Sequence, residues 1–275
     1  MAERTSIEWT RSDDGSPGAT WNPITGVEGR WSCVKISPGC HNCYAERMNV
    51  RFGGPKYVVG ADELQLHPVA INDPRHWRKP RRIFVCSMTD LFEDRVPDEW
   101  IRGVWNVMLE TPRHSYQVLT KRAQRMSEWV RMNTMAAAMP KAHRHIWLAV
   151  SVENQAYADD RIEWLLQTPA AVRFLSVEPL LGPVDLSTYL ASRKIGWVIV
   201  GGESGGPDHR RLVCREGKEW YPRPSALSWV RSLRDQCTAA GVPFFLKQWG
   251  GPTSASGGRL LDGRTWDEYP AGGER

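Results

Sequence analysis

Three cysteines lie close together near the amino end of the chain. Cys33, Cys40 and Cys43 have the spacing C-x6-C-x2-C, and Pro38-Gly39 supplies a turn between the first two. Thiolates at this spacing can converge on one soft metal centre. A structural zinc ion normally takes four protein ligands, so it would need His41 or a distant residue as well. A 4Fe–4S cluster held by three cysteines instead leaves one iron open to a small molecule. Taken alone, these residues favour iron–sulfur and zinc equally.

The other three cysteines predict different roles. Cys86 ends an apolar run and Cys237 lies on the apolar stripe of a helical segment, so both are expected to be buried core thiols. Cys214 lies in a basic segment without clear periodicity, where we expect an irregular loop. No second cysteine cluster is evident, so the sequence predicts no auxiliary cluster.

Short apolar runs alternate with segments of helical period through most of the chain. The runs predict strands near residues 20–24, 83–86, 115–119, 145–150, 173–177, 197–200 and 242–246. Helices are expected at 98–110, around 123–130, after the capping residue Asn154, and at 225–240. Strands that are apolar on both faces and separated by helices are typical of a parallel sheet with right-handed crossovers.

Charged residues follow the apolar part of most of these runs. They are Asp90, Lys121, Glu153, Glu178, Glu203 and Lys247. One such charge alone would indicate a solvated loop, but in a parallel barrel all six would converge on the rim that carries the chemistry. A doubly wound sheet would bring fewer of them to one ligand, and the glycines at 201–206 lack the G-x-G-x-x-G spacing. We therefore predict an α/β fold, a partial or full TIM-like (β/α) barrel.

Composition limits the classes of function. The 275 residues are 41% hydrophobic and 24% charged, and no apolar run approaches the roughly 18–20 residues that span a bilayer. The first nine residues lack the order of a secretory signal, which predicts a cytoplasmic protein. A net charge of +5 permits a polyanionic partner without requiring one. The fourteen tryptophans are expected mainly in the core and in clefts, with base stacking as the second interpretation.

Two segments do not fit the strand–helix pattern. Residues 53–80 have little periodicity and lead into a basic run at 75–82, which is either a solvated approach to a strand or a phosphate-contacting patch. Residues 251–275 are rich in Gly and Ser and either cover the rim or are loosely ordered. We expect one barrel over residues 1–250, followed by this tail.

The segment around the cysteines resembles the cluster motif of radical S-adenosylmethionine (SAM) enzymes. Residues 40–45, Cys-His-Asn-Cys-Tyr-Ala, look like the end of that motif, whose common form is C-x3-C-x2-C. With the strings at 21–26, 37–40, 43–46 and 176–181, the chain is similar to the phage-associated three-Cys-motif family of radical-SAM-like proteins. The resemblance covers about residues 7–251. It departs from the usual pattern in the longer first spacing, in an aromatic residue that follows the last cysteine, and in Ser-Met-Thr-Asp at 87–90, where Gly-Gly-Glu is usual.

The resemblance implies a radical SAM barrel with the cluster loop after the first strand. Cys33, Cys40 and Cys43 would ligate a 4Fe–4S cluster, and SAM would bind its open iron. An electron from a donor of the flavodoxin or ferredoxin type would cleave SAM, and the resulting 5′-deoxyadenosyl radical would abstract hydrogen from a substrate. On this interpretation the protein is cytoplasmic, in the host cell if a phage encodes it.

The resemblance also suggests roles for the polar residues after the strands. Ser87 and Asp90 are candidates for the SAM ammonium group, and Ser151 and Glu153 for its carboxylate and ribose. These four residues form the predicted cofactor site.

The later strands carry the residues expected on the substrate side. Glu178, Glu203 and Lys247 are the catalytic candidates; the alternative role for Lys247 and Lys121 is to neutralise the carboxylates. A nucleic-acid base or nucleotide, as in phage DNA modification, is the leading substrate hypothesis, while a metabolite or peptide stays open. The alternative functions are a zinc-stabilised barrel that binds nucleic acid or a partner without radical chemistry, and a hydrolase that uses the carboxylates.

Overall fold

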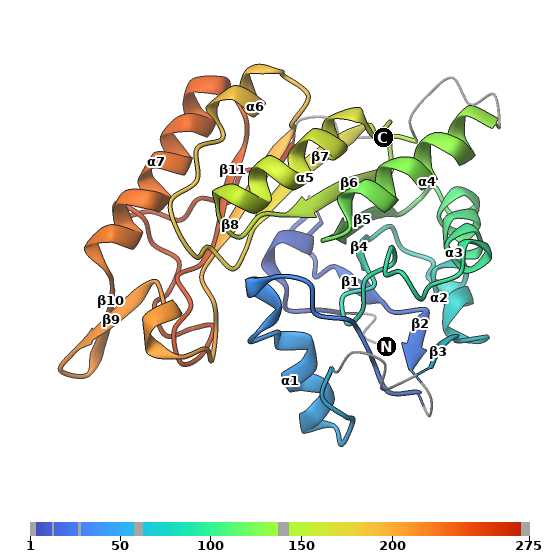
Figure 1. Ribbon diagram of the computed structural model, residues 1–275, viewed down its shortest axis with the longest axis horizontal. Helices are drawn as coiled ribbons and strands as arrows, with labels where there is room; N and C mark the ends of the chain where they lie inside the picture. The colour runs from blue at the N-terminus through green and yellow to red at the C-terminus, as the bar shows by residue number, and fades with distance from the viewer. Residues whose placement is uncertain (1–3, 13, 27–28, 58–62, 137–142, 271–275) are drawn as a thin grey trace. The chain divides into compact units, whose positions relative to one another are not determined.

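The computed structural model of the chain describes residues 4–12, 14–26, 29–57, 63–136 and 143–270 (Figure 1). It divides into two compact units. The first comprises residues 1–149 and 168–171, and the second comprises residues 150–167 and 172–275. In the part of the chain that is described, no helix has both the length and the apolar character needed to cross a membrane.

Seven strands form the main sheet, in the order β1-β4-β5-β6-β7-β8-β11. The pairs β1–β4, β4–β5, β7–β8 and β8–β11 are all parallel. The order follows the chain, as successive crossovers of one hand require. Its ends are β1 and β11, so the topology is that of a partial rather than a closed barrel.

Among its described residues, the first unit contains the amino-terminal strands and four α-helices. Its strands of the main sheet are β1 (Ala19–Trp21), β4 (Arg82–Val85), β5 (Ser115–Thr120) and most of β6 (Ile146–Ser151). Its helices are α1 (Tyr44–Arg51), α2 (Asp73–His76), α3 (Asp98–Glu110) and α4 (Ala123–Ala136). A separate antiparallel pair joins β2 (Ile24–Gly26) to β3 (Leu64–Leu66).

The second unit repeats the alternation of strands and helices. Its strands of the main sheet are β7 (Val172–Val177), β8 (Trp197–Gly201) and β11 (Phe244–Gln248). Its helices are α5 (Gln155–Gln167), α6 (Ser187–Ala191) and α7 (Pro224–Ala240). A hairpin of β9 (Val213–Glu216) and β10 (Glu219–Pro222) projects from this unit (Figure 1).

Large aromatic side chains fill both cores. Trp21 and Trp147 are wholly buried in the first unit, and Trp197 and Trp249 in the second. The buried indole N–H groups find backbone acceptors: Trp21 Nε1 donates to the carbonyl of Ala70 at 2.7 Å, and Trp197 Nε1 to that of Glu268 at 2.8 Å. For these four residues the core interpretation is confirmed.

The seven predicted strands are all present, but the first is shorter than expected. β1 ends at Trp21, and Ile24 begins β2 of the separate antiparallel pair. Pro23 lies between them and cannot donate to a strand ladder, so one continuous strand over 20–24 is disfavoured. The carbonyl of Pro23 instead accepts from the backbone N–H of His67 at 2.8 Å.

One prediction about a further segment is wrong, and two alternatives that the sequence left open can be compared with the structure. Cys214 lies on β9 rather than in an irregular loop. The basic run at 75–82 is mostly exposed up to residue 80, as in the predicted solvated approach to a strand, whereas Arg82 is buried and donates to the carbonyl of Arg11. The exposed Arg75 pairs with Glu110. In the tail, the carbonyl of Trp266 accepts from the N–H of Leu246 at 2.9 Å, which ties residues after 250 to β11.

Candidate functional site

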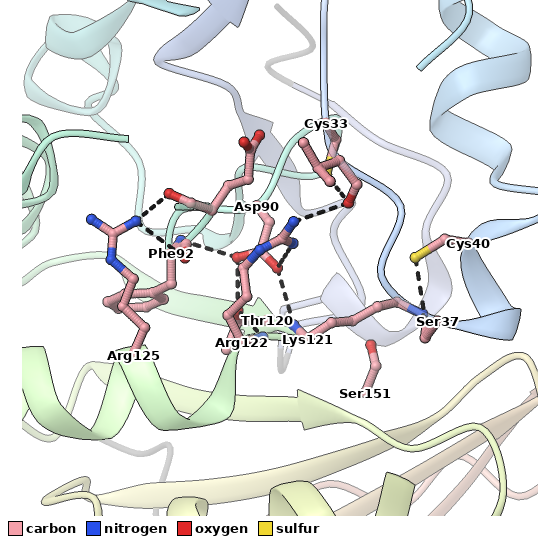
Figure 2. A network of polar contacts seen from close by, with 12 residues as sticks. Cys33, Ser37, Cys40, Asp90, Phe92, Thr120, Lys121, Arg122, Arg125 and Ser151 are labelled. Atoms are coloured by element: carbon pink, nitrogen blue, oxygen red, sulfur yellow. Dashed lines mark hydrogen bonds and ion pairs between the residues drawn. The ribbon is translucent and has the colours of Figure 1, made fainter. Parts of the chain in front are cut away.

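The three clustered cysteines lie on one continuous segment of the first unit. Cys40 ends a 3-10 turn over Pro38–Cys40, and Cys43 is the N-cap residue of α1. All three are free thiols. The Ser37 hydroxyl lies 3.4 Å from the Cys40 sulfur (Figure 2). Cys43 interacts electrostatically with both Cys33 and Cys40, so it is the common neighbour of the trio.

The surroundings of two of these thiols favour the protonated form. Burial raises the pKa of Cys33, and the nearby carboxylate of Asp90 raises it further, whereas Arg122 lowers it. Burial likewise raises the pKa of Cys43. Because thiolates are the ligands of metals, metal binding at these positions would release protons.

Asp90, in the loop after β4, is the centre of the polar network in Figure 2. Its Oδ1 accepts from the hydroxyl of Thr120 at 2.7 Å and from the backbone N–H of Phe92 at 3.0 Å. Its Oδ2 accepts from the backbone N–H of Lys121 at 3.0 Å and from Nη1 of Arg122 at 3.1 Å. An ionised carboxylate offers about four acceptor positions, and these four donors use them. Asp90 therefore joins the loop after β4 to the end of β5.

Arg122 links this network to the cysteine segment. Its Nη2 donates to the carbonyl of Val34, next to Cys33, at 2.9 Å. The guanidinium is buried, and within the described part of the chain its Nε has no hydrogen-bond partner. Burial lowers the pKa of Arg122, but the charges of Asp90 and Cys33 outweigh this and leave it raised. A permanent positive charge thus lies beside the first cysteine.

Sequence analysis singled out Lys121 and missed its neighbour Arg122. The Lys121 ammonium lies 3.5 Å from the Ser37 hydroxyl, which itself contacts Cys40. The only sequence signal for Arg122 was that it forms a basic pair with Lys121 directly after a predicted strand. The sequence does not say which of its two members turns inward to a carboxylate.

Three side chains fix the loop at Ser87 and Met88. The Asn22 amide lies 3.1 Å from the Ser87 hydroxyl, and Asn22 Oδ1 accepts from the backbone N–H of Met88 at 2.9 Å. The Tyr44 hydroxyl donates to the carbonyl of Ser87 at 2.6 Å, and the Tyr57 hydroxyl to that of Met88 at 2.7 Å. Because Tyr44 directly follows Cys43, the cysteine segment is bonded to the loop in which SAM contacts are predicted.

In the second unit, Glu153 is paired with an arginine inside the protein. It is wholly buried, and Nη1 of Arg161 lies 3.5 Å from its Oε1. The same Nη1 donates to the carbonyl of Ser151 at 2.9 Å. The Arg161 guanidinium also lies 4.3 Å from the ring centre of Tyr157. Arg161 lies on α5, the helix that directly follows Glu153, so the pattern of charges at strand ends does not indicate it.

Glu178 and Lys247, both predicted from strand ends, form an ion pair within the second unit. Nζ of Lys247 lies 2.7 Å from Oε1 and 3.0 Å from Oε2 of Glu178. A Cβ at Gly201 would lie 3.1 Å from the Glu178 carboxyl carbon, so glycine leaves room for this carboxylate. The contact matches the interpretation in which the lysine neutralises a carboxylate.

Glu203 forms a bidentate pair with Arg210, which sequence analysis did not single out. The two N···O distances are 2.8 and 2.7 Å, and Glu203 is buried. Glu203 raises the pKa of Arg210, as the charge-assisted bond requires. Glu203 is therefore held in place by Arg210.

The predicted residues are divided between the two units. The first holds Cys33, Cys40, Cys43, Ser87 and Asp90, and the second holds Ser151, Glu153, Glu178, Glu203 and Lys247. Within the first, the structure brings Asp90 to the cysteine segment through Arg122. Within the second, it pairs Glu178 with Lys247.

The donor chemistry near the cysteines fits an iron–sulfur cluster. The segment offers three free thiols, and a buried, unpartnered N–H of Arg122 lies in the charge network of Cys33. Such donors and charges are what a sulfur-rich anionic centre needs around it. No group of three or more His, Cys, Asp or Glu among the described residues is arranged to hold a metal ion. Joint binding of one metal centre by the three thiols would therefore require them to move closer together.

Residues 4–270 match the model of a family described as a protein of unknown function, DUF5131. The chain belongs to this family. A comparison with curated proteins gives no match.

Solved structures of spore photoproduct lyase, a radical SAM enzyme, resemble this chain. Its complex with dinucleoside spore photoproduct has a TM-score of 0.52 at 10% identity, covering 89% of this chain and 80% of that chain. A variant with one tyrosine replaced by phenylalanine has a TM-score of 0.51 at 8% identity and the same coverage. At this identity the similarity concerns the fold. It confirms the predicted class, an α/β partial barrel of the radical SAM type; the narrower phage-associated family stays a prediction.

Proposed function

We propose that this DUF5131 protein is a radical SAM enzyme that acts on a nucleic-acid base or nucleotide. The observation that carries the proposal is a trio of free thiols on one segment, in a chain with the radical SAM fold. Residues of that segment next to the cysteines are hydrogen-bonded to the loops after β4 and β5. When bound to such a segment, a 4Fe–4S cluster and SAM supply reductive cleavage to methionine and a 5′-deoxyadenosyl radical.

The residues of the first unit have defined tasks in this proposal. Cys33, Cys40 and Cys43 hold the cluster. Arg122 supplies a fixed positive charge beside Cys33, which offsets the charge of an anionic centre in a buried setting. Asp90 has its acceptor positions occupied by protein donors, so its first task is to position Arg122 and the end of β5. The Ser87 hydroxyl is proposed as a contact for the SAM ammonium. For Asp90 to accept from that ammonium as well, one of its four present donors would have to give way.

The other predicted site residues lie in the second unit. Ser151 and Glu153 are proposed to serve the carboxylate and ribose of SAM, and Arg161 orients the strand end that carries them. Glu178, Glu203 and Lys247 are proposed on the substrate side. The two carboxylates are already ion-paired, with Lys247 and Arg210, which holds them in place.

Two observations support a nucleic-acid substrate. Spore photoproduct lyase, which shares the fold, has been solved with dinucleoside spore photoproduct. In this chain the β9–β10 hairpin carries Trp220 with the guanidinium groups of Arg211 and Arg215 each 5.9 Å from its ring centre. The exposed Tyr221 follows it. Arginines interleaved with aromatic rings suit a phosphate backbone and stacked bases. More specifically, we propose that the substrate is a base in phage DNA. This part of the proposal rests on the sequence resemblance.

Iron loading and SAM cleavage test the cofactor part. Protein purified and reconstituted without oxygen should bind about four irons, bleach on addition of dithionite, and release 5′-deoxyadenosine from SAM. Cys40→Ala should lose the iron, while Cys214→Ala, a thiol outside the segment, should keep it. Stoichiometric zinc in place of iron, or unchanged iron in Cys40→Ala, would contradict the assignment.

DNA binding tests the substrate part. Affinity for single-stranded DNA should fall steeply with salt, and Arg215→Ala should weaken it and reduce the salt slope by about 1. Arg102→Ala removes an exposed positive charge on α3 and serves as the control. Binding that does not respond to salt would remove the support for a nucleic-acid substrate.

A further inference from the structure

Helix α1 exposes apolar residues and buries polar ones. Glu46 and Asn49 are buried, whereas Tyr44, Met48 and Val50 are 37–44% exposed. Phe52, at the end of the helix, is 58% exposed. A surface helix normally turns its apolar stripe toward the core. The reversal leaves an apolar surface in solvent at the periphery of the first unit, with none of its other helices alongside (Figure 1).

The buried polar face fixes this orientation. Glu46 accepts from Nζ of Lys35 at 2.7 Å and from the backbone N–H of Tyr57 at 2.9 Å. Asn49 bonds to both backbone groups of Trp31, at 3.1 and 2.9 Å, and donates to the carbonyl of Pro55 at 2.8 Å. Rotating the helix to bury Met48 would break these bonds and leave their buried partners unsatisfied. The outward apolar face is therefore a built feature of the fold.

The same surface is positively charged. Arg47 and Arg51 are exposed on α1, and Lys56 is exposed just after it. The acidic residue of the helix, Glu46, is buried and paired with Lys35. An apolar centre flanked by positive charges complements an acidic protein surface. The exposed rings of Tyr44 and Phe52 belong to the same face, so nucleic acid is the alternative occupant that the test below must separate from a protein.

The surface adjoins the cysteine segment, because Cys43 is the N-cap residue of α1. We propose that the exposed face of α1, defined by Tyr44, Arg47, Met48, Arg51 and Phe52, docks an acidic electron-donor protein of the flavodoxin or ferredoxin class. This inference rests on the proposed function, since it assumes a cluster on the three cysteines. Electron transfer weakens steeply with distance, so a donor must dock beside the cluster. The small size of the face suits the limited interfaces of transient redox complexes.

The test measures how fast the reconstituted cluster is bleached by reduced flavodoxin and, separately, by dithionite. Met48→Glu and the double variant Arg47→Glu/Arg51→Glu should slow reduction by flavodoxin about tenfold, and the wild-type rate should fall as salt rises. Val69→Glu, at an exposed apolar site outside α1, is the matched control and should keep the wild-type rate. Reduction by dithionite needs no docking and should be the same in all four proteins.

Each remaining outcome would overturn the inference. Unchanged flavodoxin rates in both α1 variants mean that the donor docks elsewhere. Loss of a dimer or of DNA binding in Met48→Glu, with the flavodoxin rate kept, assigns the face to a second copy or to nucleic acid. A large fall in melting temperature in that variant means that the chain itself covers the face. If wild-type protein binds no iron or is not bleached by dithionite, the proposed function itself has failed, and the inference fails with it.

Discussion

Removing either member of the buried pair of Asp90 and Arg122 should be among the most destabilising single substitutions in the first unit. Their N···O distance is 3.1 Å, and both side chains are less than a tenth exposed. At an effective dielectric constant of about 20, that distance corresponds to an attraction of about 5 kcal/mol before desolvation is subtracted. Removing one partner leaves the other charge buried, which costs about 3–5 kcal/mol. We expect Asp90→Asn and Arg122→Gln each to lower the free energy of unfolding by about 3 kcal/mol.

A double-mutant cycle separates the pair from its surroundings. In Asp90→Asn/Arg122→Gln the second change should cost less than it does alone, giving a coupling energy of about 1.5–3 kcal/mol. Urea unfolding of the reduced, metal-free protein measures all four free energies. Arg125 and Asp98 supply the matched control, because their N···O distance is also 3.1 Å but the Asp98 side chain is 57% exposed. Asp98→Asn should cost no more than about 1 kcal/mol.

Additive costs for Asp90 and Arg122 would refute the argument, because they would mean that the two charges do not sense one another. Equal costs for Asp90→Asn and Asp98→Asn would refute it as well, since burial would then have no effect on the worth of an ion pair at fixed distance.

Three further changes have expected outcomes. In Gly206→Ala the new Cβ would lie 2.0 Å from Oε2 of Glu203, so we expect the free energy of unfolding to fall by about 1–3 kcal/mol. Gly182→Ala has open space around the new Cβ and should be nearly neutral. Equal effects of the two substitutions would contradict the steric reasoning. Burial lowers the pKa of His114 from 6.5 to about 4, so between these pH values the folded state binds fewer protons than the unfolded state. The free energy of unfolding should therefore fall as the pH drops from about 6.5 to 4. A wild-type urea midpoint that stays constant over this range, and that does not differ from that of His114→Gln, would exclude the effect. Tyr57→Phe removes the hydroxyl that bonds to the loop after β4 and should lower the unfolding free energy by about 1 kcal/mol, and an unchanged melting curve would show that the bond contributes nothing.

The strands and their polar ends were predictable because their signal is local. Apolar runs such as 197–200 are short, β-branched and bounded by turn residues, and the residue that follows a parallel strand has a fixed place in the sheet. The pairing of Glu178 with Lys247 was among the alternatives that this pattern left open.

The arginine partners were not predictable because their contacts depend on tertiary folding. Arg122 reaches a carboxylate 32 residues earlier in the chain, and Arg161 reaches Glu153 from the following helix. The chain has many arginines, and spacing alone does not indicate which one turns inward. The orientation of α1 has the same cause: its polar face is buried because Lys35 and Trp31, outside the helix, supply the hydrogen-bond partners.

Arg122, which bonds to the cysteine segment, and Asn22 and Tyr57, which bond to the neighbouring loop at Met88, all come from the same unit as the cysteines. The carboxylates that follow the later strands lie in the second unit, and so do their partners Lys247, Arg161 and Arg210. Substitutions in one set therefore leave the supporting contacts of the other intact. This modularity would let the polar residues of one unit vary while the contacts that support the cysteines stay unchanged.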